Sequence, residues 1–195
     1  MTRKVLWMAG GLLTASAIIG IGVHLQQRPS RSGLSEAPVQ SVSSAASAAP
    51  VPTETHSPLL TGRHAPVFRV VTLNAGTVHV PGARPTVVYF MSASCGSCIS
   101  GEQQLARVAA QTPATVQWLS LDVEPGYDTS AAVLKMARDT RAHWPQAFAT
   151  NAIINAYHVT QLDTVAVIAK NGTLVYDGAL PASRQLRQLT HEAET

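Results

Sequence analysis

The sequence predicts an α/β domain in which helices flank a mixed central β-sheet. From about residue 60 onward, apolar runs rich in β-branched residues alternate with stretches of helical periodicity, and the alternation ends in a hairpin and a final helix. Alternating strands and helices are typical of parallel strands with helical crossovers, whereas a hairpin adds antiparallel strands. The only two cysteines of the chain follow directly after one of the buried strands, so this fold would also place the candidate site.

Residues 1–25 are predicted to form a membrane anchor. The basic pair Arg3-Lys4 precedes a run from Val5 to Val23 without a charged residue, and a membrane-spanning helix needs roughly 17 to 25 such residues. The run is longer than the core of a cleaved signal peptide, although Ala15-Ser16-Ala17 is an acceptable peptidase site. Arg28 and Arg31 weaken the positive-inside criterion for orientation. A single-pass, uncleaved anchor with the bulk of the chain exported is the simplest arrangement.

Residues 26–59 are predicted to be a flexible linker, and residues 60–195 the folded domain. Ser, Ala and Pro dominate the linker, which has no hydrophobic periodicity. Four of the 14 basic residues precede residue 60, so the net charge of +3 for the whole chain falls to +1 for the domain, with ten Lys or Arg against nine Asp or Glu. Without a basic run, nucleic-acid binding has no electrostatic support.

The first half of the domain is predicted to hold a hairpin, a buried strand and a helix. Two short strands, 67–73 and 77–80, flank the turn signal Asn74-Ala75-Gly76. The continuous apolar run TVVYFM at 86–91 is typical of a strand buried on both faces. From Cys98 to Ala110 the apolar residues recur along one helical side.

The second half repeats the strand–helix unit and closes with a hairpin. A buried strand is expected at 115–123, followed by a turn at Pro125-Gly126 and a helix capped by Asp128 or Thr129. Asn171-Gly172 is a strong signal for a two-residue hairpin. The remaining predicted elements are a short helix at 151–157, hairpin strands at 165–169 and 173–176, and a helix at 183–192.

Cys95 and Cys98 form a CxxC pair at the junction of the 86–91 strand and the following helix. A helix N-terminus offers unpaired N–H groups and partial positive charge, which stabilise a thiolate. A thiolate at Cys95 could attack a disulfide, and a thiol one turn later, at Cys98, could resolve the mixed disulfide. The spacing therefore favours a redox pair.

Two other interpretations of the pair stay open. A zinc site needs two further Cys or His ligands, and no second CxxC or HxxxH occurs. A purely structural disulfide would close a very short loop and constrain the unfolded chain little. No cofactor or metal is assigned from these patterns.

The motif and its surroundings resemble the thioredoxin fold in its membrane-anchored, TlpA-like (redoxin) form. The matching stretches are VVYFMSASCGSC, VQWLSLDVEP and AYHVTQLDTVAVIAKNGTLVYDG, within residues 63–190. The resemblance implies a thioredoxin-like fold and a thiol-disulfide oxidoreductase tethered to the inner membrane, with its domain in the periplasm. It also implies that the substrates are protein dithiols or disulfides and that a membrane protein donates the electrons. It modestly favours the reducing direction.

Three positions depart from that family. Ser94 stands where many members have a tryptophan, and Gln103 stands where the helix usually has a kinking proline. Asp163 matches the cis-proline beside the cysteines, and because a non-proline cis bond costs about 3 to 4 kcal/mol, we expect a trans peptide. A carboxylate there would oppose thiolate formation at Cys95. Asp163 is thus a third candidate catalytic residue, a proton shuttle for Cys98, or else a solvated loop acid.

Two alternative functions remain. Asp122 to Thr129 also resembles the DPxxDT stretch of SCO-type copper chaperones, which bind copper through two cysteines and a histidine; here Gln161 occupies the histidine position and His158 is the nearest substitute. The other alternative is an interaction module whose redox motif no longer turns over, since the cis-proline is missing.

Overall fold

The computed structural model describes residues 61–195, and the predicted anchor and linker lie outside the described residues. Within 61–195 the chain forms seven strands and four helices. The strands are β1 (Phe68–Val71), β2 (Thr77–Val80), β3 (Thr86–Met91), β4 (Gln117–Asp122), β5 (Gln146–Phe148), β6 (Thr164–Ile168) and β7 (Leu174–Ala179). The helices are α1 (Gly96–Ala109), α2 (Ser130–Thr140), α3 (Asn151–Ala156) and α4 (Ser183–Glu192). None of these four helices has the length and apolar character needed to cross a membrane.

Five strands form a mixed sheet in the order β5-β4-β3-β6-β7. β3 pairs with β4 in parallel, and β4 does the same with β5, whereas β6 is antiparallel to both β3 and β7. β1 and β2 form a separate antiparallel hairpin. The predicted mixed sheet with flanking helices is therefore confirmed.

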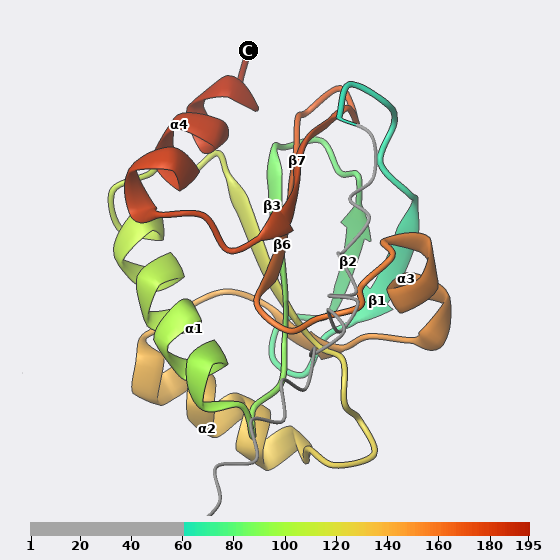
Figure 1. Ribbon diagram of the computed structural model, residues 1–195, viewed down its shortest axis with the longest axis vertical. Helices are drawn as coiled ribbons and strands as arrows, with labels where there is room; N and C mark the ends of the chain where they lie inside the picture. Colours follow the sequence, from blue (N-terminus) through green and yellow to red (C-terminus); the bar gives the residue numbers. More distant parts are fainter. Residues whose placement is uncertain (1–60) are drawn as a thin grey trace, which may run out of the picture. The chain divides into compact units, whose positions relative to one another are not determined.

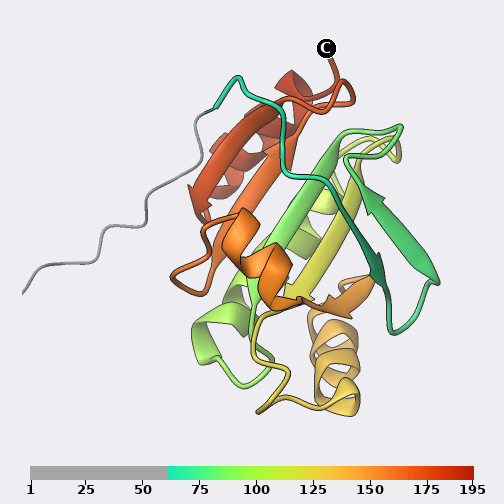
Figure 2. The same ribbon diagram turned by 90° about the vertical axis from the view of Figure 1, so that its right-hand side faces the viewer.

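Layers of different composition cover the two faces of the sheet. α1, α2 and α4 lie on one face, and α3 lies on the other together with the β1–β2 hairpin (Figure 1). The view turned by 90° shows α3 and the hairpin in front of the strands (Figure 2). Alternate residues of β3 serve the two layers: Tyr89 belongs to the core under α1, whereas Phe90 packs with Tyr157 in the other core. All six residues of β3 are buried, as its unbroken apolar pattern predicts.

Most predicted elements are present, with boundaries shifted by a few residues. The strand β5 is not predicted from the sequence. A strand of three residues is too short to show a hydrophobic period, and its first residue, Gln146, is polar. The backbone N–H of Gln146 donates to Asn74 Oδ1 at 2.9 Å, so the β1–β2 turn is fixed to this edge strand. Thr129, rather than Asp128, caps α2, since its hydroxyl accepts from the backbone N–H of Ala132 at 3.2 Å.

Candidate active site

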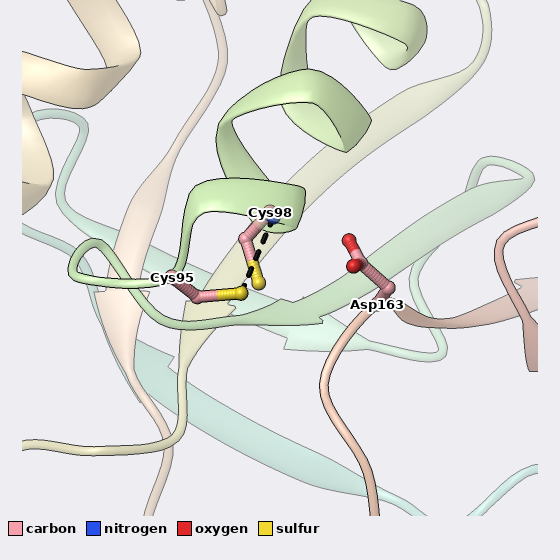
Figure 3. Close-up of side chains that lie close together, drawn as sticks. All are labelled: Cys95, Cys98 and Asp163. Carbon is pink, nitrogen blue, oxygen red and sulfur yellow. Dashed lines mark hydrogen bonds between the residues drawn. The ribbon is translucent and has the colours of Figure 1, made fainter. Parts of the chain in front are cut away.

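The two cysteines lie where β3 leads into α1. Cys95 is the N-cap of α1, with extended backbone dihedrals, and its sulfur accepts a hydrogen bond from the backbone N–H of Cys98 at 3.3 Å. Figure 3 shows both side chains at the first turn of the helix. Cys95 is partly exposed, whereas Cys98 is fully buried. The spacing predicts an attacking thiol and a resolving one, and the structure adds that Cys95 is the more exposed of the two residues.

The surroundings give the two thiols different acidities. Burial raises the pKa of Cys95, but hydrogen bonds from the Cys98 thiol, the Ser97 hydroxyl and the Cys98 backbone N–H outweigh it, so the pKa lies below its ordinary value. The Ser97 oxygen is 3.1 Å from the Cys95 sulfur. For Cys98, burial and the hydrogen bond to Cys95 raise the pKa to about 12. Of the two thiols, Cys95 therefore ionises first.

Asp163 lies beside the two cysteines, as the comparison with the cis-proline position implies. It directly precedes β6, and Figure 3 shows its carboxylate pointing toward the sulfur atoms. The sulfur atoms of Cys95 and Cys98 and a carboxylate oxygen of Asp163 all lie within 4.8 Å of one another. The peptide before Asp163 is trans, as expected, and the residue adopts φ +60°, a region that Asp tolerates better than most residues.

The expected effect of Asp163 on Cys95 is confirmed in direction, but it does not decide the net shift of the pKa of this thiol. Its negative charge does act to raise the pKa of Cys95, but that contribution is smaller than the hydrogen bonds that lower it. The net direction is downward because the thiolate caps a helix and accepts from Ser97, features that outweigh one partly exposed carboxylate.

Tyr89 and Gly101 complete this corner of the site, and sequence reasoning missed both. Tyr89 belongs to the buried strand predicted at 86–91, and its hydroxyl donates to Asp163 Oδ1 and lies 3.2 Å from the carbonyl oxygen of Cys98. Gly101 lies in α1 directly opposite: a Cβ there would overlap the Tyr89 hydroxyl and lie 2.7 Å from Asp163 Oδ1. No local pattern signals this relationship, because the residues come from β3, α1 and the loop before β6.

Two aspartates hold the loop that carries the cysteines. Asp122 Oδ2 accepts from the backbone N–H of Ala93 at 2.9 Å, and Asp128 Oδ2 accepts from the Ser92 hydroxyl at 2.7 Å. Burial raises the pKa of Asp122 to about 6, while the hydrogen bonds that Asp128 accepts from Ser92 and its neighbours outweigh burial and lower its pKa. Ser94, at the position of the missing tryptophan, is exposed and lies 2.9 Å from the Ser92 hydroxyl.

A buried carboxyl group lies beneath α1, deeper than the cysteines. Glu102 is fully buried and accepts from the Ser120 hydroxyl at 2.9 Å and from Gln146 Nε2 at 3.1 Å. Trp144 Nε1 in turn donates to the Ser120 hydroxyl at 2.8 Å. Burial raises the pKa of Glu102 to about 7, although both hydrogen bonds act in the opposite direction. Gln103, the next residue, is exposed on a helix that runs unbroken from Gly96 to Ala109.

The histidine of the copper alternative is not in place. A metal ion can be held by three or more Cys, His, Asp or Glu side chains whose ligand atoms lie close together. Among residues 61–195, such a group is formed by Cys95, Cys98 and Asp163. His158 and Gln161 are exposed and outside that group.

Comparison with known structures establishes a thioredoxin-like fold. The thioredoxin domain of a thiol-disulfide oxidoreductase from Bacteroides vulgatus superposes with a TM-score of 0.59 at 14% identity, over 69% of this chain and 97% of that one. A thiol:disulfide interchange protein of the thioredoxin family from Chlorobium tepidum gives 0.58 at 18% identity, over 67% and 94%. A thioredoxin-like protein from Aeropyrum pernix gives 0.57 at 18% identity, over 65% and 89%.

Sequence comparison gives a weaker likeness. A Streptomyces lividans protein described as mercury resistance operon ORF3 is 26% identical over 131 residues, which is 64% of this chain and 68% of that protein. No protein-family model matches the chain.

Proposed function

We propose that the chain is a thiol-disulfide oxidoreductase in which Cys95 is the attacking thiolate and Cys98 the resolving thiol. The main support is that the two cysteines differ in exposure and acidity. Cys95 is partly exposed, caps α1 and has a lowered pKa, whereas Cys98 is buried with a pKa of about 12. Two-step disulfide exchange requires one sulfur that attacks as a thiolate and a second thiol nearby that resolves the mixed disulfide. The names of the oxidoreductases that share this fold support the proposal.

The first step forms a mixed disulfide. The Cys95 thiolate attacks one sulfur of a substrate disulfide, the Cys95–substrate bond forms, and the substrate S–S bond breaks. The second substrate sulfur leaves as a thiolate and takes a proton from solvent. Because Cys95 is the more exposed member of the pair, a substrate disulfide meets its sulfur before that of Cys98.

The second step uses the buried thiol. Cys98 must lose its proton, and the Asp163 carboxylate, within 4.8 Å of its sulfur, is placed to accept it directly or through one water. The Cys98 thiolate then attacks the Cys95 sulfur, the Cys95–Cys98 disulfide forms, and the first substrate sulfur, which was bound to Cys95, leaves as a thiolate. Two electrons have passed from the cysteine pair to the substrate, so a dithiol donor must reduce the Cys95–Cys98 disulfide again.

The reducing direction is the one that the site favours. A strong oxidant stabilises the thiolates of its reduced form. Here hydrogen bonds lower the pKa of Cys95, but the carboxylate beside both sulfurs acts against its thiolate, and Cys98 is held as a thiol. CGSC also differs from the thioredoxin motif only at Ser97.

The cellular setting is part of the same proposal. The uncharged run at 5–23 and the Ser/Ala/Pro-rich stretch that follows would tether the domain to the outer side of the inner membrane. Protein disulfides of the periplasm would then be the substrates and a membrane protein the electron donor.

The test is the midpoint potential of the Cys95–Cys98 pair in the full-length chain, solubilised in detergent and equilibrated with glutathione buffers. We expect a reversible two-electron couple near the thioredoxin value of about −270 mV. A value near −120 mV would reverse the proposed direction. A pair that does not cycle would refute the enzymatic function and leave the interaction module. Cys98→Ser should accumulate the mixed disulfide, and Cys95→Ser should form none.

A second candidate is binding of a thiophilic metal ion by the same residues. The observation that favours it is the close grouping of two sulfurs and a carboxylate. The relative from Streptomyces lividans is named for a mercury resistance operon, and mercury, like copper and zinc, is a metal that thiolates bind.

A further inference from the structure

Asp163 adds a carboxylate ligand beside the two cysteine sulfurs, so three side chains rather than two could bind a metal ion here. Cys95 and Cys98 come from the start of α1, and Asp163 approaches from the loop before β6 (Figure 3). Their ligand atoms lie within 4.8 Å of one another, so small side-chain movements would bring all three to the 2.0–2.3 Å bond lengths of a zinc-like ion.

We propose that the reduced protein binds one zinc-like divalent cation through the sulfurs of Cys95 and Cys98 and one carboxylate oxygen of Asp163. Two thiolates and a carboxylate suit a borderline ion such as Zn²⁺, whereas Cu⁺ selects sulfur ligands. Both cysteines bind the ion as thiolates, so any proton still on either sulfur is released on binding, and no electron is transferred. Three anionic ligands and one divalent cation give the site a net charge of −1.

The carboxylate is held in place for this role. Tyr89 donates its hydrogen bond to Asp163 Oδ1, so a buried side chain orients the carboxylate. Ligating carboxylates are themselves usually hydrogen-bonded, and such partners fix their orientation. The backbone carbonyl oxygen of Asp163 also accepts from the N–H of Leu180 at 2.7 Å, which fixes the loop.

The site would have an open fourth position. Cys98 is fully buried, but Cys95 and Asp163 are both partly exposed, so the ion would enter from their side and keep a water there. A site with three protein ligands and one water exchanges its ion more readily than a closed four-ligand site. The geometry therefore points to a reversible ion rather than to a structural one.

Metal binding would regulate the thiol chemistry, an inference that rests on the proposed function. The ion occupies the sulfur lone pairs that attack a disulfide, so the metal-bound form cannot exchange. Because the disulfide form offers no thiolates, the ion binds only the reduced form and stabilises it by mass action. The midpoint potential should then rise by about 30 mV for each tenfold increase in free Zn²⁺ above the dissociation constant.

The experiment uses the full-length chain in detergent, reduced with a phosphine and titrated with Co²⁺ as a coloured substitute for Zn²⁺. We expect one Co²⁺ per chain, a sulfur-to-cobalt charge-transfer band, and displacement by Zn²⁺. Asp163→Asn should weaken Zn²⁺ binding at least about tenfold, since even loss of an outer partner costs 10- to 100-fold. The matched control is Asp139→Asn, the same change at an exposed residue of α2, which should leave the affinity unchanged.

The outcomes separate this inference from the proposed function. No Co²⁺ bound by the reduced chain, or equal affinity in Asp163→Asn, would overturn the metal site while a reversible couple still stands. A potential that is independent of free Zn²⁺ would overturn the regulatory role. If the pair fails to cycle yet binds Co²⁺ through Asp163, the metal site stands and the oxidoreductase proposal fails.

Discussion

The Tyr89 hydroxyl in the middle of β3 donates a hydrogen bond to the carboxylate of Asp163, 74 residues further along the chain. Tyr89 is fully buried, so its hydroxyl depends on this partner and on the carbonyl oxygen of Cys98. The pair connects the centre of the sheet to the cysteines. It makes Asp163 a fixed part of the site rather than a solvated loop acid.

Replacing Asp163 by asparagine should make the protein a stronger oxidant. Removal of the negative charge stabilises the Cys95 thiolate, because Asp163 acts to raise the pKa of that thiol. The midpoint potential should rise by on the order of 30 mV, equivalent to about tenfold in the equilibrium constant. Equilibration with glutathione buffers at pH 7 measures it, with Asp139→Asn as the control. An unchanged or lower potential would mean that the charge does not act on the pair.

Replacing Tyr89 by phenylalanine should destabilise the domain by about 1 to 2 kcal/mol. The change removes one buried hydrogen bond and leaves Asp163 Oδ1 without its donor. Urea denaturation measures the free energy of unfolding. Tyr176→Phe is the matched control, since its hydroxyl bonds to the carbonyl oxygen of Ala179 in an exposed position. Equal costs for the two variants would argue against a special role of Tyr89.

An alanine at position 101 should disturb the same corner. The added Cβ would overlap the Tyr89 hydroxyl, and overpacking of a buried site typically costs about 1 to 3 kcal/mol. Gly96→Ala is the control, because a Cβ at Gly96 meets nothing within 4 Å and lies in the same helix. Thermal unfolding of both variants compares them, and similar melting temperatures would contradict the close approach.

Glu102 should make the domain less stable as pH rises. Its pKa is about 7 in the folded chain and about 4.5 when unfolded, so the folded state binds more protons between these values. The free energy of unfolding must then fall across that window, by on the order of 3 kcal/mol. Glu102→Gln, which cannot ionise, should flatten this dependence in urea titrations from pH 4.5 to 8. The control Glu192→Gln, at an exposed position, should retain the pH dependence. If the slope were unchanged in Glu102→Gln, another group would be its cause.

The two thiols should differ in their reaction with iodoacetamide. Cys95, partly exposed and with a lowered pKa, should be alkylated rapidly at pH 7, whereas Cys98, buried with a pKa of about 12, should stay unmodified. Mass spectrometry of the reduced chain after timed quenching distinguishes the two peptides. Modification of Cys98 at the same rate would remove the basis for the assigned roles.

By itself the sequence determined the order and type of most elements and the position of the dithiol. The apolar run at 86–91, the Asn171-Gly172 turn and the periodicity after Cys98 are local patterns, and local patterns reflect backbone preferences and burial directly. The placement of Cys95 at a helix start follows from the same signals. Asp163 was located only through the resemblance to the thioredoxin fold.

Only the tertiary structure decided what surrounds the sulfurs. The Tyr89–Asp163 hydrogen bond, the space left by Gly101 and the Asp122–Asp128 support of the cysteine loop join residues from separate elements. The edge strand β5 likewise exists because β4 offers it a partner, not because of its own three residues. Such contacts depend on packing in three dimensions, and the acidities of Cys95 and Cys98 depend on burial and hydrogen bonds that the packing creates.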